Sequence, residues 1–331
     1  MQQWQFAQRQ SLPYEAKKIH AAKVAYEFRD WAVENDKNLC VSIGGLDSLT
    51  LYKFLKNLGI DAVPVSVSVL EDKSIQDIHI SIPGMVFLKP IMSKVEVIKK
   101  FGFPVISKEK ANKIETLQNP TDKNSTVRNA IITGDTGKQG GYRTGTRMRL
   151  PQKWLNLFGG PENEKYGTNY KTAPFKVSNK CCYYLKEKPS HIWQKENNMI
   201  PYLGLMASEG GQREKGLMKN GCNYYGKTTT RSAPFAIFHR QDLLRLAIEL
   251  EVPVPEIYGE IVRDEEGSLR TTKAQRTGCT MCGFGIHLEK RPHRFDRLKE
   301  TNYKEWQFWM YNVGWGDVLN YIGIGWEDEI H

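Results

Sequence analysis

A short group of residues suited to binding a ligand begins where an apolar run ends. Residues 39–43 form that run, Gly44 and Gly45 follow it, and Asp47 and Ser48 open a segment with helical spacing. Two glycines let the backbone turn sharply and approach a ligand closely. Asp47 and Ser48 can cap N–H groups at a helix start, where the remaining N–H groups favour an anion such as phosphate. The pattern predicts a strand, a tight turn and a helix, as either an ordinary turn or a phosphate-binding loop.

A second group consists of cysteines. Cys181 and Cys182 are adjacent, and Cys279 and Cys282 form a C-x-x-C pair far downstream. Two such sites in a chain with six cysteines favour a metal over structural disulfides, because thiolates select zinc or iron–sulfur clusters. Adjacent side chains of an extended strand point opposite ways, so Cys181 and Cys182 would suit a tetrahedral zinc site poorly. Cys40, within the apolar run, is expected to be a buried structural thiol.

The sequence around these groups predicts strands and helices that alternate along the chain. Helical spacing of apolar residues occurs within residues 1–36 and 93–101, and Val-rich or apolar runs lie at 61–70 and 84–88. Strands alternating with helices predict an α/β fold with a doubly wound, mostly parallel sheet, whose ligands bind beyond the carboxyl ends of the strands. We expect the N-terminal helix to pack on the sheet edge.

We expect three segments: an N-terminal helical segment (1–36), a nucleotide-binding α/β domain (37–260), and a helical extension with the C-x-x-C pair packed on it (261–331). Within the second, residues 117–180 are less regular. Their basic stretch around Arg143, Arg147 and Arg149 is either a loop that closes over a polyanion or a solvated insertion.

The C-terminal segment also has two open interpretations. Its basic run, residues 286–299, is either a nucleic-acid contact or a solvated helix that Pro292 opens. Its aromatic side chains have near-helical spacing, and we interpret them as core packing in preference to base stacking. They are Trp306, Phe308, Trp309, Tyr311 and Trp315.

The composition favours some classes of protein and argues against membrane proteins. Of 331 residues, 47 are Lys or Arg and 37 are Asp or Glu, so the formal charge is +10, which suggests a polyanionic partner or a merely basic protein. No apolar run approaches the roughly 20 residues of a membrane span. The polar start lacks the layout of a signal peptide, so we expect a cytoplasmic protein with no membrane partner.

The loop residues resemble a known motif. Gly44-Gly45-Leu46-Asp47-Ser48 resembles the Ser-Gly-Gly-x-Asp-Ser pyrophosphate (PP) loop of the adenine-nucleotide α-hydrolase superfamily, which includes ATP pyrophosphatases and sulfonucleotide (PAPS and APS) reductases. The family's leading serine falls on Ile43. Residues 203–213 resemble the family segment whose acid and arginine line the nucleotide site. The resemblance implies that ATP or a related adenine nucleotide, with Mg²⁺, is bound by Ser42, Gly44, Gly45, Asp47, Ser48, Glu209 and Arg213.

The cysteine spacing resembles another feature of this superfamily. Cys-Cys-x-x-Leu-Lys-x-x-Pro followed by Gly-Cys-x-x-Cys is similar to the layout by which APS reductases hold a [4Fe–4S] cluster. The resemblance implies Cys181, Cys182, Cys279 and Cys282 as ligands. Cys222 has no counterpart in the pattern and is an alternative to Cys181 or Cys182. Zinc is the alternative metal.

The expected chemistry follows from a missing residue. Sulfonucleotide reductases attack the sulfate with a C-terminal cysteine, and no cysteine follows Cys282. We therefore expect ATP pyrophosphatase chemistry, with Asp47, Ser48 and Arg213 catalysing adenylation of an acceptor for sulfur transfer. Similar proteins that modify DNA or tRNA imply a nucleic-acid acceptor and a sulfur-donor or regulatory protein partner. The alternatives are a non-catalytic nucleotide- and cluster-dependent module acting on DNA, and a sulfonucleotide reductase that uses an external thiol.

Overall fold

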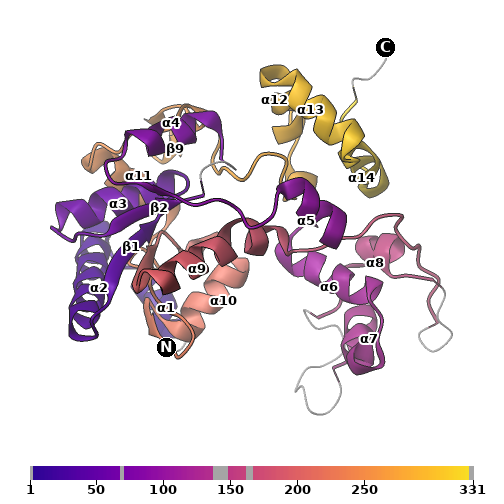
Figure 1. Cartoon of the computed structure of the whole chain (residues 1–331), viewed down its shortest axis with the longest axis horizontal. Coiled ribbons are helices and arrows are strands. Elements are labelled where there is room, and N and C mark those ends of the chain that lie inside the picture. Colours follow the sequence, from indigo (N-terminus) through magenta and orange to yellow (C-terminus); the bar gives the residue numbers. More distant parts are fainter. Residues whose placement is uncertain (1–2, 68–70, 137–147, 162–166, 328–331) are drawn as a thin grey trace. The chain divides into compact units, whose positions relative to one another are not determined.

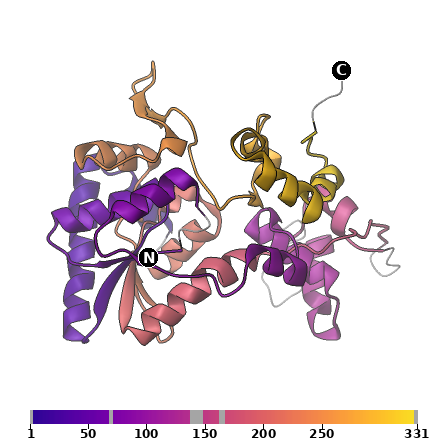
Figure 2. The same ribbon diagram turned by 45° about the horizontal axis from the view of Figure 1, so that its top comes forward.

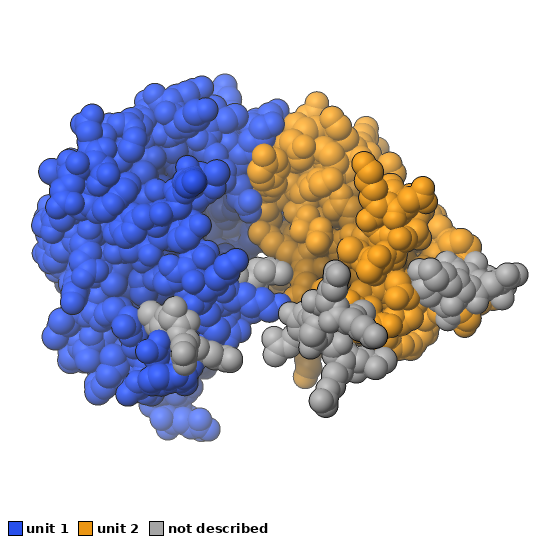
Figure 3. Space-filling view, turned by 90° about the horizontal axis from the view of Figure 1, so that it is seen from below, with its two compact units in different colours: residues 1–91, 186–280 blue, residues 92–185, 281–331 orange. Residues whose placement is uncertain are grey.

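The chain divides into two compact units. The computed structural model describes residues 3–67, 71–136, 148–161 and 167–327. Unit 1 comprises residues 1–91 and 186–280, and unit 2 comprises residues 92–185 and 281–331 (Figure 3). The three expected segments do not coincide with these units, since the chain leaves unit 1 after residue 91 and returns to it at residue 186. Within the described ranges, no helix has the length and apolar character needed to cross a membrane.

Unit 1 is built on a six-stranded sheet with the strand order β3-β2-β1-β5-β7-β6. All neighbouring pairs are parallel except β6 with β7, which confirms the expected α/β fold with a mostly parallel sheet. From β1 the chain proceeds outward through β2 and β3, and from β5 it proceeds in the opposite direction, so the order reverses between β1 and β5. The strands are β1 (Asn38–Ser42), β2 (Val63–Ser66), β3 (Val86–Phe87), β5 (Met199–Leu203), β6 (Asn223–Tyr225) and β7 (Thr230–Ser232).

Cys40 lies in the middle of this sheet. It pairs in register with Val63 of β2 and Pro201 of β5, and it is fully buried, as expected of a structural thiol. Burial also raises the pKa of its thiol to about 12. A thiol that stays protonated is a poor metal ligand, so Cys40 contributes packing alone.

Seven α-helices are described in unit 1, together with a β8–β9 hairpin (Figures 1 and 2). The longest helix, α2, contacts β1 and β7, so it covers the face of the sheet. Our expectation that the N-terminal helix packs on the sheet edge was therefore wrong. The elements are α1 (Gln3–Gln10), α2 (Tyr14–Glu34), α3 (Leu46–Asn57), α4 (Lys73–Ser81), α9 (Lys188–Glu196), α10 (Gly211–Asn220), α11 (Arg240–Glu249), β8 (Ile261–Arg263) and β9 (Leu269–Thr271).

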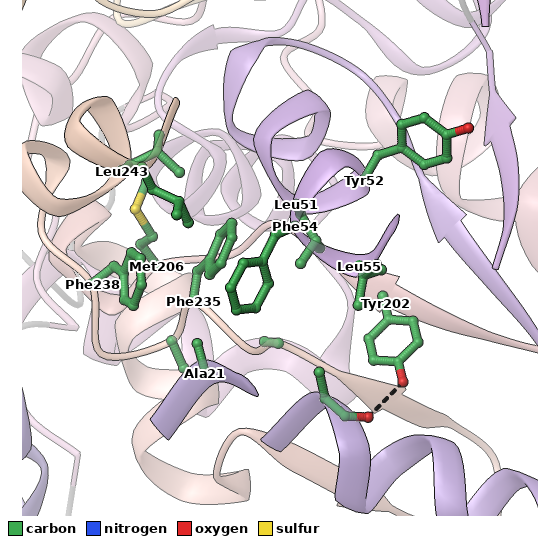
Figure 4. Close-up of a cluster of buried hydrophobic side chains, with 14 of the residues drawn as sticks. Ala21, Leu51, Tyr52, Phe54, Leu55, Tyr202, Met206, Phe235, Phe238 and Leu243 are labelled. Carbon is green, nitrogen blue, oxygen red and sulfur yellow. Dashed lines mark hydrogen bonds between the residues drawn. The ribbon is translucent and has the colours of Figure 1, made fainter. Parts of the chain in front are cut away.

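A single apolar core joins α2, α3 and α11 to the sheet (Figure 4). Phe54 of α3 packs against Phe235, and Phe235 stacks on Phe238 just before α11. The Tyr202 hydroxyl of β5 donates a hydrogen bond of 2.7 Å to the Ala25 carbonyl oxygen of α2. These contacts join α3 to the segment before α11, and β5 to α2, within one core.

Unit 2 is mainly helical around its own core. Phe103 and Phe295 both pack edge-on against the fully buried Trp315. A short parallel pair, β4 with β10, brings distant segments together. The elements are α5 (Lys94–Phe101), β4 (Val105–Ile106), α6 (Lys108–Gln118), α7 (Ser125–Thr133), α8 (Gln152–Phe158), β10 (Gly283–Phe284), α12 (Arg294–Thr301), α13 (Tyr303–Gln307) and α14 (Trp315–Ile322).

The C-terminal aromatic side chains only partly form this core. Trp306, Trp309 and Trp315 are buried, as expected. Phe308 is 43% exposed and Tyr311 is 60% exposed, so the core interpretation was wrong for these two. They lie in a π-helical turn, Phe308–Asn312, whose wider winding shifts them off the face that the tryptophans share.

Of the basic stretch expected to close over a polyanion, Arg143 and Arg147 lie outside the described residues. Arg149 is described, and its guanidinium donates to the Ile132 carbonyl and to Gln152.

Candidate functional site

The Gly44–Ser48 loop lies where the strand order of the sheet reverses. β1 ends at Ser42, which is half-buried, and α3 begins at Leu46. Ile43 points into the core and is 5% exposed. In open α/β sheets the crevice at such a reversal is where ligands bind. The structure thus brings the predicted loop to the position where a phosphate would meet the N-terminus of α3.

Ser48 closes this turn. Its Oγ accepts a hydrogen bond from the Gly44 amide at 2.7 Å and donates to the Gly45 carbonyl at 3.0 Å. Ser48 therefore fixes the loop ahead of the helix and does not cap the helical N–H groups as we expected. The amides of Gly45 and Asp47 donate to no other residue that the structure describes. Two backbone donors thus remain for a ligand at this helix start.

Asp47 also does not cap the helix; it binds Arg240. Its Oδ1 accepts a hydrogen bond of 2.5 Å from Arg240 Nη1, at the first residue of α11. Burial raises the pKa of Asp47, and the Arg240 charge opposes that rise. The Nε and Nη2 atoms of Arg240 are buried and have no partner among the described residues. Buried guanidinium donors without a partner are costly and point to an anionic ligand beside Asp47.

Tyr258 covers the start of the loop. Its hydroxyl accepts a hydrogen bond of 3.2 Å from the Leu46 amide and contacts Thr277 Oγ1 at 2.8 Å. A Cβ on Gly45 would collide with the same hydroxyl. Glycine is thus required at position 45 by the close approach of Tyr258.

The loop after β5 supplies an acid that pairs with two arginines from other segments. Glu209 ends a 3₁₀ turn, Ala207–Glu209, and its carboxylate forms ion pairs with Arg213 and with Arg276, the latter at 3.0 Å. The charges of Glu209 and Arg276 both act on the pKa of Asp47, so these groups lie near the Gly44–Ser48 loop. The structure therefore brings the predicted Glu209 and Arg213 to the same region as the predicted loop.

A buried histidine supports the loop from β2 and α4. His79 Nε2 lies 2.8 Å from the Gly44 carbonyl oxygen, and Nδ1 lies 3.2 Å from Ser66 Oγ. Because a carbonyl can only accept, Nε2 carries the hydrogen and Nδ1 accepts from the serine. Burial lowers the pKa of His79, which keeps the ring neutral. His79 is thus a positioning residue for Gly44.

Lys186 connects this region to a predicted cysteine. Its ammonium forms an ion pair with the buried Glu71, whose Oε1 would lie 3.7 Å from a Cβ on Gly44. Burial lowers the pKa of Lys186, but the neighbouring Cys279 and Glu71 outweigh it and raise that pKa above its usual value. Lys186 therefore stays charged, with the Cys279 thiol within hydrogen-bonding reach.

The cysteines are all free. Cys181 and Cys182 begin a helical turn, so our expectation of an extended strand was wrong, and the argument from a strand against zinc no longer applies. Cys279 belongs to unit 1, while Cys181, Cys182 and Cys282 belong to unit 2. Across the described ranges, no three His, Cys, Asp or Glu side chains gather so as to hold a metal ion.

Cys222 has different surroundings. It is buried in the apolar core of unit 1, with its Sγ 3.9 Å from His20 Nε2 of α2. Burial raises the pKa of its thiol to about 11.

Several residues of this site were not predicted. Arg240, Tyr258 and Arg276 contact predicted site residues but come from segments 190 or more residues downstream of the Gly44–Ser48 loop. His79 is one of several histidines, and nothing in its sequence context marks it. A lone Arg or His is usually solvated, so only the tertiary contacts could reveal Arg240, Arg276 and His79.

Comparison with known proteins gives likenesses to solved structures. No protein-family model and no curated protein matches the chain. A solved structure of phosphoadenylyl-sulfate (PAPS) reductase from Candida auris, in a phosphate complex, aligns with a TM-score of 0.37 and 13% sequence identity, over 78% of this chain and 98% of that one.

Proposed function

We propose that unit 1 binds ATP or a related adenine nucleotide at the Gly44–Ser48 loop and transfers its adenylate to an acceptor. One observation carries the proposal. Beside Asp47, at the N-terminus of α3, the amides of Gly45 and Asp47 and two buried nitrogens of Arg240 have no partner among the described residues. A phosphate group satisfies such converging donors, and its charge is favoured by the helix dipole.

Adenylation needs positioning and charge stabilisation more than covalent chemistry. An acceptor oxygen attacks the α-phosphorus, the bond from that phosphorus to the bridging oxygen breaks, and pyrophosphate leaves with the electron pair. The helix start and Arg240 would hold the departing pyrophosphate. Arg213 and Asp47 would orient the phosphates, and Mg²⁺ would enter with the nucleotide.

The proposal includes a [4Fe–4S] cluster, and the chemistry of the cysteine side chains supports it. Cys181, Cys182, Cys279 and Cys282 would hold it, because four free thiols suit iron–sulfur clusters, with zinc as the alternative. When bound, such a cluster would supply sulfur or a structural cross-link. Free cysteines throughout also fit a reducing compartment, so we propose a cytoplasmic protein.

The charge of the two units supports a nucleic-acid acceptor, DNA or tRNA. Unit 2 carries 23 Lys and Arg against 15 Asp and Glu, a net charge of +8, whereas unit 1 carries 24 against 22, a net charge of +2. The basic excess of the chain is thus concentrated in the unit without the nucleotide loop. A basic unit attracts the phosphate backbone of nucleic acids. A separate sulfur-donor or regulatory protein completes the proposed set of partners.

Pyrophosphate release tests the proposal. Anaerobically purified protein is incubated with ATP, Mg²⁺ and mixed tRNA or DNA, and pyrophosphate is measured against time. We expect release that Arg213→Gln and Asp47→Asn each reduce at least about tenfold. The first variant removes a cation proposed to contact phosphate, and the second removes the carboxylate that holds Arg240. Arg245→Gln is the control, because Arg245 is an exposed arginine of α11 whose partners are Glu15 and Glu249. No release with any acceptor would refute adenylation.

A second candidate is a nucleotide- and cluster-dependent regulatory module on DNA. The observation that favours it is Ile43, whose buried side chain puts no hydroxyl at the start of the loop. ATP binding without pyrophosphate release would support this candidate. Production of sulfite from APS or PAPS with an added thiol would instead support a sulfonucleotide reductase.

A further inference from the structure

Two aromatic rings stack beside the predicted cysteine pair in unit 2. Phe101, the last residue of α5, lies parallel to Tyr184, with ring centroids 4.8 Å apart and an interplanar angle of 11°. Tyr183 continues the group edge-on at 5.1 Å from Tyr184. The Tyr183 side chain is 43% exposed, so the stack reaches the surface. We call Phe101, Tyr183 and Tyr184 the aromatic stack.

Two lysines lie over the same ring. Lys180 Nζ is 5.2 Å from the Phe101 centroid, and Lys100 Nζ is 5.5 Å from it. Lys180 is also paired with Glu115 at 2.7 Å, whereas Lys100 is exposed at the end of α5. The face of an aromatic ring attracts a cation. The two ammonium groups are therefore held beside the stack, where they can contact a ligand bound to it.

A stack with an exposed ring at one end and two lysines over the ring at its other end matches the chemistry of one ligand class. Single-stranded nucleic acids offer an aromatic face for stacking and a phosphate for a cation in every nucleotide, and proteins that bind them combine these same two features. An acidic peptide would use the lysines but not the exposed ring. The net charge of +8 on unit 2 favours the polyanion as well.

We propose that the aromatic stack binds an unpaired base of a single-stranded nucleic acid, with Lys100 and Lys180 holding its phosphates. The identification of this strand as the acceptor rests on the proposed function; the binding itself does not. Cys181 and Cys182 directly precede Tyr183 in the chain. A base stacked on Tyr183 would therefore contact a residue that is next in the chain to the cysteine pair, where sulfur chemistry is proposed.

Oligonucleotide binding without ATP tests the proposal independently of adenylation. Fluorescence anisotropy is measured with a labelled 20-nucleotide single strand, as DNA and as RNA, and with the matching duplex. We expect a single strand to bind more tightly than the duplex, because a paired base cannot reach the stack. Tyr183→Leu, which keeps an apolar side chain but removes the ring, should weaken single-strand binding at least about fivefold, and Tyr183→Phe should restore it.

Phe308→Leu is the matched control. Phe308 is also 43% exposed and also belongs to unit 2, but its ring packs against Trp309 and not against the aromatic stack. We expect Phe308→Leu to bind the single strand as tightly as the unchanged protein does. Equal losses from Tyr183→Leu and Phe308→Leu, or no loss from Tyr183→Leu, would overturn the assignment to the stack.

A comparison of two neighbouring lysines distinguishes a specific contact by one cation from a general effect of positive charge. Lys99 and Lys100 are both exposed on the last turn of α5, but only Lys100 lies over Phe101. Lys100→Gln should weaken binding severalfold more than Lys99→Gln, and the difference should shrink with added salt. Equal effects of the two variants, or preference for the duplex, would refute the proposal. Binding that persists when pyrophosphate release is absent would leave this inference standing and refute only adenylation.

Discussion

The hydroxyl of Tyr258 accepts a hydrogen bond from the Leu46 amide at 3.2 Å, although 212 residues separate the two. Tyr258 is 4% exposed, and Thr277 Oγ1 holds the same hydroxyl from the other side at 2.8 Å. The hydroxyl thus occupies one amide donor at the start of α3 and leaves no room for a side chain at position 45. Any phosphate at this loop binds next to Tyr258.

Gly45→Ala is expected to destabilise the protein by about 1–3 kcal/mol, the usual cost of forcing an added methyl group into a packed site. The new Cβ would meet Tyr258 Oη and also Thr277 Oγ1 at 3.0 Å. The shift in the midpoint of urea unfolding, followed by circular dichroism, measures this cost. Gly44→Ala is the control, since the nearest atom to its added Cβ is Glu71 Oε1 at 3.7 Å.

Removal of the Tyr258 hydroxyl should relieve the collision. In Gly45→Ala/Tyr258→Phe the nearest atom of that ring lies 3.4 Å from the new Cβ. The double variant should therefore lose less free energy of unfolding than the sum of the losses in Gly45→Ala and Tyr258→Phe. Strict additivity would show that Tyr258 does not set the identity of residue 45.

Arg240→Gln is expected to weaken nucleotide binding about 10- to 100-fold, because hydrogen bonds to a charged group contribute roughly 1.5–3 kcal/mol. Isothermal titration with ATP and Mg²⁺, and separately with pyrophosphate, measures the change. If Arg240 serves only to neutralise Asp47, the variant Arg240→Gln/Asp47→Asn should bind as tightly as the unchanged protein. Full affinity in that double variant would contradict a phosphate contact by Arg240.

The fold of unit 1 could be predicted in outline because its signals are local. The apolar run 39–43 and the glycines after it identify β1 and the turn, and the Val-rich run 61–70 identifies β2. Alternation of strands with helices then requires a parallel sheet. The division into units could not be predicted, since nothing in the sequence near residues 91 and 186 marks where the chain leaves unit 1 and returns to it.

The candidate site could be predicted only where one segment supplies several groups. Gly44, Asp47 and Ser48 are contiguous, so their spacing indicates a loop. The partners of Asp47 were misassigned, because a helix-start aspartate usually caps, and a tertiary contact with Arg240 overrides that preference here. Similarly, the π-helical turn exposes Phe308 and Tyr311, which a regular 3.6-residue period places in the core.

His79 should make stability depend on pH. Burial lowers its pKa in the folded state below the ordinary value of 6.5. Below about pH 6.5 the unfolded chain therefore binds a proton that the folded chain excludes, so stability rises with pH in this window and is lost as pH falls. Between pH 7.5 and 5.5 the loss due to His79 is at most about 1.4 kcal/mol.

His79→Gln should reduce the pH dependence of the unfolding midpoint between pH 7.5 and 5.5. His191→Gln, at an exposed position of α9, controls for loss of a histidine as such. His79→Gln should also weaken nucleotide binding, since the contact to the Gly44 carbonyl is altered. An unchanged pH dependence would mean that the folded protein accepts a proton on His79 as readily as the unfolded chain does.

Cys222→Ala is expected to leave the metal content unchanged. Cys222 lies in the apolar core beside His20, and burial holds the pKa of its thiol at about 11, so the thiolate that a metal requires is disfavoured. Iron, sulfide and zinc are measured on anaerobically purified protein, where a [4Fe–4S] cluster gives about four irons and four sulfides per chain. Ala substitution of Cys181, Cys182, Cys279 or Cys282 should each lower the metal content.

The comparison uses variants whose circular dichroism matches that of the unchanged protein, because a buried Cys→Ala change costs about 1 kcal/mol of stability. An equal loss of metal in Cys222→Ala would make Cys222 a ligand.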